Sequence, residues 1–228
     1  MESKTNEKAE VKKNLGNNEF KKGNHSAAIT YYTEAIEIEP HEDIYSNRAA
    51  SYIAQKQYKL ALEDCQAAFR LNPNFARLYK RLFKAHLALG NVSEAEEALK
   101  LAVEKDPSDK TNKADLEIMD TVKHQVQMIA KYGVSLEPTD MEEAANEDTD
   151  FEKAVGYCTS VLKHCPCSVR LNCLKVKILL LANRAKEAEA FTKELMERPE
   201  MNTNSDIYAW RGRTLVYSGR DEVGKKFL

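Results

Sequence analysis

Five polar side chains in the first half of the chain have residue types and a spacing that suit the binding of an anion. Lys13 and Asn17 are four residues apart, and so are Arg77 and Arg81, so each pair shares one side of a helix. Asn47 lies 34 residues after Lys13 and 34 residues before Arg81. Arginine offers forked, bidentate donors, and the asparagine amides add neutral hydrogen bonds. If one structural period brings these residues together, three cations and two amides with no acid among them form a site for a carboxylate-rich ligand.

The surrounding sequence repeats with that period. Three segments can be superimposed, and their closing prolines lie 33 and 34 residues apart: Ala9–Pro40, Glu42–Pro73 and Ala76–Pro107. Small or apolar residues share fixed offsets: Gly16, Ala49 and Phe83; Ala28, Ala61 and Ala95; Tyr32, Cys65 and Leu99; Ala35, Ala68 and Ala102. This pattern resembles the tetratricopeptide repeat, or TPR, a helix-turn-helix unit of 34 residues. Such units stack because none can bury its apolar face alone.

The repeats predict an all-α fold, a right-handed α-solenoid of TPR helix-turn-helix units in two arrays. The expected parts are a flexible N-terminus over 1–8, a first array of three repeats over 9–107, a capping or bridging helix over 108–134, an acidic linker or displaced helix over 135–149, and a degenerate, truncated second array over 150–228. In the first array we expect helices near 9–22, 26–38, 43–55, 59–72, 74–89 and 93–105, with Gly23 capping the first. The bridging helix should bury one apolar stripe: Leu116, Met119, Val122, Val126 and Ile129.

The second array is less regular. It restarts near Asp150, after a stretch over 140–152 with seven acidic residues and no basic residue. That stretch could bind a cation or a basic partner, but we favour a solvated linker or short exposed helix, because it lacks the spacing of an EF-hand loop. The last repeat stops halfway, at Leu228, without a polar cap. We therefore expect a fragment of a longer protein.

Composition excludes several classes of function. The chain has 228 residues, a net charge of −2 and 43% hydrophobic residues, which gives no case for nucleic-acid or membrane binding. The N-terminus has no apolar core, so it is not a secretory signal, and the longest apolar run, Ile178–Ala182, is too short to cross a bilayer. Five cysteines without a pairing pattern indicate a reducing compartment, hence the cytoplasm or the nucleus.

We expect neither an enzyme nor a metal or cofactor site. The sequence has no Gly-rich phosphate loop, no nucleophile elbow and no metal signature. One group invites a zinc interpretation but has no paired Cys-x-x-Cys elements: Cys158, His164, Cys165, Cys167 and Cys173. Cysteine is a common small core residue, and we favour that interpretation.

Three short motifs carry a more specific resemblance. The sequences KNLGN, YSNRAA and RLYKR resemble the carboxylate clamp of co-chaperone TPR domains. In that family the clamp holds the two carboxylates of the last aspartate in a Glu-Glu-Val-Asp tail, which ends the cytosolic seventy- and ninety-kilodalton heat-shock chaperones. The resemblance implies a clamp of five residues: Lys13, Asn17, Asn47, Arg77 and Arg81. Arg77 departs from the lysine usual there, which keeps the charge but adds a longer, planar group that can alter tail preference.

The chain as a whole resembles the DnaJ (J-domain) co-chaperones that have two TPR domains. The three-repeat block, the sequence LALGNVSEA, a long connecting helix and the restart TDFEKAV occur there in the same order. In that family a J domain follows the second array, and this sequence contains no His-Pro-Asp loop, in agreement with the expected truncation. The resemblance implies a non-enzymatic adaptor that grips chaperone tails with its first array. The alternative is a TPR scaffold that binds an unrelated internal peptide or helix.

The second array contains a possible second cationic groove, formed by Lys175, Lys177, Arg211 and Arg213. These residues lack amide partners at the clamp offsets, and solvated helix faces explain them equally well. Such a groove would offer a second contact and raise the effective concentration of a linked ligand. We interpret Trp210 as a core or inter-repeat packing residue.

Overall fold

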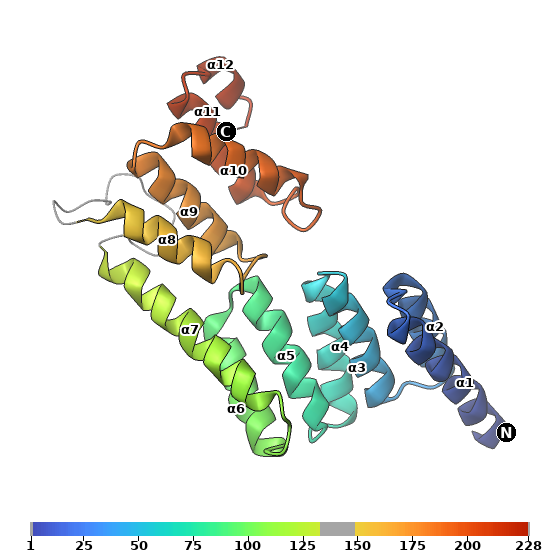
Figure 1. Ribbon diagram of the computed structural model, residues 1–228. Coiled ribbons are helices and arrows are strands. Elements are labelled where there is room, and N and C mark those ends of the chain that lie inside the picture. The colour runs from blue at the N-terminus through green and yellow to red at the C-terminus, as the bar shows by residue number, and fades with distance from the viewer. Residues whose placement is uncertain (1, 133–148, 228) are drawn as a thin grey trace. The chain divides into compact units, whose positions relative to one another are not determined.

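The computed structural model describes residues 2–132 and 149–227, without the side chains of residues 2–5, and these residues form helices joined by turns (Figure 1). The predicted fold class, an all-α solenoid of TPR repeats, is confirmed. The helices are α1 Glu2–Lys21, α2 His25–Ile38, α3 Glu42–Ala54, α4 Tyr58–Leu71, α5 Ala76–Leu89, α6 Val92–Lys105, α7 Asn112–Lys131, α8 Phe151–Val161, α9 Val169–Leu181, α10 Ala185–Glu197, α11 Ser205–Tyr217 and α12 Asp221–Gly224.

The chain divides into two compact units. Unit 1 consists of Met1–Leu87 and Ser93–Asp115, and unit 2 consists of Ala88–Val92 and Leu116–Leu228. The division therefore falls within α5 and α7. Residues 135–148 of the predicted linker lie outside the described part of the chain.

The first six helices follow the repeat pattern, with one difference at the N-terminus. Helix α1 begins at Glu2, so the prediction of a flexible segment over 1–8 is corrected. Residues 2–8 contain no glycine or proline to stop a helix, and they include the good helix formers Glu and Lys. At the other end of α1, Gly23 has a φ of 82° and the amide of Asn24 donates to the carbonyl of Glu19 at 2.9 Å, which confirms the predicted glycine cap.

The core of unit 1 lies where the small repeat residues let helices approach. One cluster joins α2 and α3 and contains Ala28, Tyr32, Ala35 and Ile44. A second joins α3, α4 and α5 and contains Ala49, Ala61, Cys65, Ala68, Leu78 and Ala85. A close approach occurs at Gly16 of α1, where an added Cβ would lie 2.6 Å from the ring of Tyr32. Only glycine therefore fits at this position unless the buried tyrosine ring moves.

Helix α7 corrects one residue of the predicted apolar stripe. Met119, Val122 and Ile129 are buried as expected, but Leu116 is 42% exposed and the adjacent Asp115 is buried. The apolar pattern did not predict the burial of Asp115, because an acidic residue is expected on the exposed side of a helix.

A buried ion pair explains the position of Asp115. The ammonium of Lys80, from α5, lies 2.6 Å from a carboxylate oxygen of Asp115 and donates to the hydroxyl of Thr111 at 3.0 Å. Asp109 adds a second carboxylate 3.4 Å from the same ammonium. A charge can be buried at low cost only when it is paired and hydrogen-bonded in this way.

Three helices of unit 2 begin with side-chain caps. Asp150, Ser168 and Asn204 each accept a hydrogen bond from a backbone amide in the first turn of α8, α9 and α11. Trp210 is buried, which confirms its interpretation as a packing residue. The five cysteines lie in buried positions, in agreement with their interpretation as core residues.

The Lys80–Asp115 pair provides a stability test. We expect Asp115→Ala to lower the free energy of unfolding by about 3 kcal/mol, because it leaves the Lys80 ammonium buried beside a weaker set of acceptors. Urea denaturation measures this change. The apolar double variant Lys80→Met, Asp115→Leu should recover most of the loss.

The matched control is Lys100→Ala, which breaks an exposed pair between Lys100 and Glu96 and should change stability by less than about 0.5 kcal/mol. An unfolding midpoint for Asp115→Ala equal to that of the unmodified chain would contradict a stabilising role for the buried pair.

Candidate functional site

The five predicted clamp residues lie on the first helix of each of three consecutive repeats in unit 1. Helix α1 carries Lys13 and Asn17, α3 carries Asn47, and α5 carries Arg77 and Arg81. We call these five residues the clamp face. The contacts below show which of them the structure brings together and what holds each one.

Asn17 and Asn47 are in direct contact. The side-chain amide of Asn47 donates to Oδ1 of Asn17 at 3.1 Å, and the hydroxyl of Tyr32 donates to the same oxygen at 2.8 Å. Two donors thus occupy the carbonyl oxygen of Asn17 and fix the orientation of its amide. The amide hydrogens of Asn17 find no acceptor among the described residues, so they are available to a ligand.

Tyr32 hydrogen-bonds to the clamp face, whereas the sequence analysis assigned it only to the core. It is buried on α2, and burial raises its pKa to about 12, against the opposing effect of the Arg81 charge. Tyr32 therefore remains a neutral hydroxyl donor at physiological pH. A signal for this role was present in the sequence, since an aromatic residue with a hydroxyl stands in a repeat position that Cys65 and Leu99 occupy in the next two repeats.

Arg81 is a cation without a matched anion. Its Nε is buried and has no hydrogen-bond partner among the described residues. Burial lowers the pKa of Arg81, and the nearby charge of Arg77 lowers it further. Arg77 is itself exposed, with its guanidinium 5.5 Å from the ring centre of Phe75. Two neighbouring guanidinium groups, one of them half-buried, attract an incoming carboxylate.

Lys13 differs from the expectation of an acid-free set. Its ammonium lies 2.6 Å from the carboxylate of Glu10 and 2.9 Å from that of Asp43. Burial opposes the charge of Lys13, but these two hydrogen bonds outweigh it and raise the pKa of the ammonium. Glu10 was detectable from the sequence, since it precedes Lys13 by three residues on the same helix. Asp43 was missed because it comes from the next repeat.

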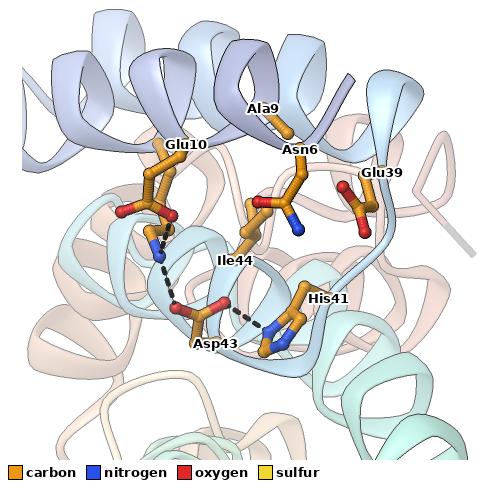
Figure 2. Close-up of a pocket in the computed structure, with 8 residues that line it drawn as sticks. Asn6, Ala9, Glu10, Glu39, His41, Asp43 and Ile44 are labelled. Carbon is orange, nitrogen blue, oxygen red and sulfur yellow. Dashed lines mark hydrogen bonds and ion pairs between the residues drawn. The ribbon is translucent and has the colours of Figure 1, made fainter. Parts of the chain in front are cut away.

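A cavity of about 110 Å³ lies beside Lys13, between α1 and the start of α3. Figure 2 shows the side chains of Asn6 and Glu10 from α1 and of His41 and Asp43 from the start of α3 around this space. The ring nitrogen Nδ1 of His41 lies 2.7 Å from Oδ1 of Asp43. The lining of the cavity beside Lys13 is therefore acidic, with the carboxylates of Glu10, Glu39 and Asp43.

The predicted second cationic groove is wrong for two of its four residues. Lys177 is 1% exposed, so it cannot line an open groove. Arg211 is held by unit 2 itself, since its guanidinium donates to the carbonyl of Glu189 at 2.7 Å and to the hydroxyl of Thr192 at 3.1 Å.

The other two cations of that group each lie over an aromatic ring. The ammonium of Lys175 is 4.3 Å from the ring centre of Phe191, and the guanidinium of Arg213 is 4.7 Å from that of Trp210. Residues two apart on a helix point in different directions, which explains why four cations in the sequence do not converge.

The described residues offer no alternative chemistry of the kinds considered. They contain no group of three His, Cys, Asp or Glu side chains that could hold a metal ion. Burial raises the pKa of the thiols to about 12, which keeps them neutral and unreactive: Cys65, Cys158, Cys165 and Cys173. None of the described helices is long and apolar enough to cross a membrane.

Comparison with known proteins agrees with the repeat assignment. Residues 9–42 and 52–114 each match a family profile described as "Tetratricopeptide repeat". Among curated proteins, the human "DnaJ homolog subfamily C member 7" is 28% identical over 221 residues, which cover 96% of this chain and 42% of that protein. The chain thus contains tetratricopeptide repeats in its first half and is similar to a DnaJ homologue, of which it spans less than half the length.

One solved structure is similar to about half of the chain, and another is similar to nearly all of it. The first TPR of Spaghetti (RPAP3), bound to the HSP90 peptide SRMEEVD, is 29% identical with a TM-score of 0.50, and covers 52% of this chain and 94% of that one. The P58(IPK) TPR domain has a TM-score of 0.75 at 18% identity, and covers 96% of this chain and 58% of that one. The second similarity shows the fold alone.

The hydroxyl of Tyr32 provides a test of the clamp face. Tyr32→Phe keeps the ring against Gly16 but removes one of the two donors that orient Asn17. We expect the affinity for a peptide ending in Glu-Glu-Val-Asp to fall between about twofold and tenfold, the effect of one hydrogen bond. Isothermal titration calorimetry measures the change.

The control for this substitution is Tyr31→Phe, the same change at the adjacent residue, where the ring contacts Lys12 and the hydroxyl makes no contact with the clamp face. Equal affinities for Tyr32→Phe and Tyr31→Phe would show that the Tyr32–Asn17 hydrogen bond has no part in ligand binding.

Proposed function

We propose that this chain is a co-chaperone adaptor whose first TPR array binds the C-terminal Glu-Glu-Val-Asp tails of cytosolic seventy- and ninety-kilodalton heat-shock chaperones. The clamp face holds the terminal aspartate. The observation that carries this proposal is the state of Arg81, a half-buried arginine whose Nε is buried and has no partner among the described residues. A buried donor of this kind is costly to leave without an acceptor, and a carboxylate ligand is a group that can supply one.

The asparagines supply the complementary half of the site. The amide hydrogens of Asn17 point away from its bonds with Tyr32 and Asn47, and they can donate to a carboxylate without adding charge. A terminal aspartate presents two carboxylates to these donors, one from the main chain and one from the side chain. Together, the two arginines and the two asparagines offer charged and neutral donors for that pair of charges.

The similarity to the RPAP3 TPR supports this choice of ligand. That protein was solved with an HSP90 peptide ending in EEVD, and its similarity covers about half of this chain. The similarity to the DnaJ homologue supports a place among co-chaperones. Under this proposal the chain acts by binding rather than by catalysis, and it acts in the cytoplasm or nucleus, where these chaperone tails occur.

The alternative function is a scaffold for an internal peptide or helix. The C-terminal group of the ligand distinguishes the two functions, because only the clamp requires a free carboxylate. We expect a peptide ending in Glu-Glu-Val-Asp with a free carboxylate to bind, and its C-terminally amidated form to bind at least about tenfold more weakly. The amidated peptide loses one of the charged groups that the clamp face matches. Equal binding of the two forms, measured by fluorescence anisotropy, would favour the internal-peptide scaffold.

Arg81 provides the test of the site itself. Arg81→Met keeps the apolar stem and removes the charge, so tail affinity should fall at least about 30-fold, the cost of leaving a desolvated carboxylate unpaired. Since burial lowers the pKa of Arg81, its charge costs folding stability, and the variant should melt at the same temperature or higher. Lys100→Ala, on the second helix of the third repeat, should bind normally. Full tail affinity of Arg81→Met would remove Arg81 from the site.

The ionic strength dependence of binding follows from the same contacts. The proposed contacts are ionic and partly exposed, and the screening length falls from about 10 Å at 0.1 M salt to about 3 Å at 1 M. We expect tail affinity to weaken steadily as sodium chloride is added. An affinity that does not change with salt would indicate an apolar binding surface instead.

A further inference from the structure

One cation of the clamp face is already neutralised by the chain. An ammonium has three N–H donors, and Lys13 directs two of them to Glu10 and Asp43. One donor remains for a ligand. The side chain of Lys13 is 17% exposed and that of Asp43 is 25% exposed, so this contact is only partly screened by water.

Asp43 is held in place from several directions. It lies in the first turn of α3, where a negative charge is favourable. One carboxylate oxygen contacts Lys13 at 2.9 Å, and the other contacts His41 at 2.7 Å. Burial raises the pKa of Asp43, but the hydrogen bond and charge of Lys13 and the contact with His41 outweigh it, so that the pKa is lowered and the group stays ionised at neutral pH.

Glu10 is held less firmly. Its side chain is 51% exposed, and it contacts Lys13 from the same helix, three residues away. Such an exposed pair contributes little and can open at low cost when a ligand arrives. The second oxygen of Glu10 accepts only from Asn14, a neighbour on the same helix, at 3.2 Å. Asp43 is more buried and pairs with Lys13 from a different helix, so it cannot move away as easily.

A carboxylate that binds to Lys13 must therefore approach within a few ångströms of the Asp43 carboxylate. We propose that Asp43 is an internal competitor for the ligand carboxylate at Lys13 and sets the affinity of the clamp face below its maximum. This inference rests on the proposed function, since it assumes a carboxylate ligand at Lys13. Like charges at such distances repel, and the ligand also has to share an ammonium that is already engaged.

The acidic lining of the adjacent cavity extends the effect. Glu39 and Glu10 line it together with Asp43 and Lys13, and Figure 2 shows the three carboxylates around this space. A ligand whose negative charge extends past Lys13 into this space meets further like charge. Asp43 thus determines both how tightly a carboxylate is held and how much negative charge is tolerated at this end of the clamp face.

The test removes the charge of Asp43 and keeps its shape. Asp43→Asn retains an oxygen that can accept from Lys13, while the repulsion of the ligand is lost. We expect it to bind the free-carboxylate Glu-Glu-Val-Asp peptide about tenfold more tightly than the unmodified chain, which corresponds to about 1.4 kcal/mol. The gain should be smaller for the amidated peptide, because that ligand brings less charge to Lys13.

Glu37→Gln is the charge-matched control. Glu37 is exposed on α2, on the second helix of the first repeat, and makes no contact with the clamp face. Glu37→Gln removes the same charge from unit 1 as Asp43→Asn does, and it should leave the peptide affinity unchanged. A gain of equal size in both variants would mean that net charge alone, and not competition at Lys13, sets the affinity.

The outcomes separate this inference from the proposed function. If the unmodified chain binds the free and amidated peptides equally, the proposed function fails. If it prefers the free carboxylate but Asp43→Asn gains nothing, only the competition is overturned. A weaker affinity of Asp43→Asn, with an unchanged melting temperature, would overturn it as well, by showing that Asp43 holds Lys13 in the orientation that binds.

Discussion

The contact between Gly16 and Tyr32 connects the core of unit 1 to its clamp face. Because Gly16 has no side chain, the ring of Tyr32 can lie against the backbone of α1 and be buried in the cluster that joins α2 and α3. From that position its hydroxyl reaches Asn17, which in turn accepts from Asn47. The orientation of two polar residues on the clamp face thus depends on a packing contact beneath it, so that the solenoid core acts as the support for the site.

The cations of unit 1 show how the protein separates stability from binding. Arg48 is bonded to both carboxylate oxygens of Asp64, at 2.9 and 2.7 Å, and Lys80 is bonded to Asp115. These charges are matched within the chain and hold helices together. The Nε of Arg81 is also removed from water, but it is unmatched among the described residues. A sequence can therefore retain such a cation only at a cost in stability, which is the usual condition of a residue kept for a ligand.

Much of this could be predicted from the sequence, because a repeat specifies helices and core by local pattern. The period placed Ala28, Ala61 and Ala95 in the core, and all three are fully buried. It failed where a polar residue occupies a buried position, as Asp115 does in place of Leu116. It also failed for Lys177, since a lysine within an apolar helix face is interpreted from sequence as a solvated charge. Pairing between distant residues decides these cases, and no local pattern contains that information.

The separation of contacting residues shows what the repeat period leaves out. Equivalent residues are 34 apart, but Lys13 contacts Asp43 and Asn17 contacts Asn47, each at a separation of 30. A residue on the first helix of one repeat therefore does not face its equivalent on the first helix of the next repeat. It faces the residue four positions earlier, which is about one helical turn, because 3.6 residues make a turn. The equivalent of Lys13 in the second repeat is Asn47, and this equivalence suggested an acid-free site. The residue that Lys13 contacts is Asp43. Asn47 and Arg77 have the same separation of 30. Had this offset been used with the sequence, it would have placed the competing acid beside Lys13.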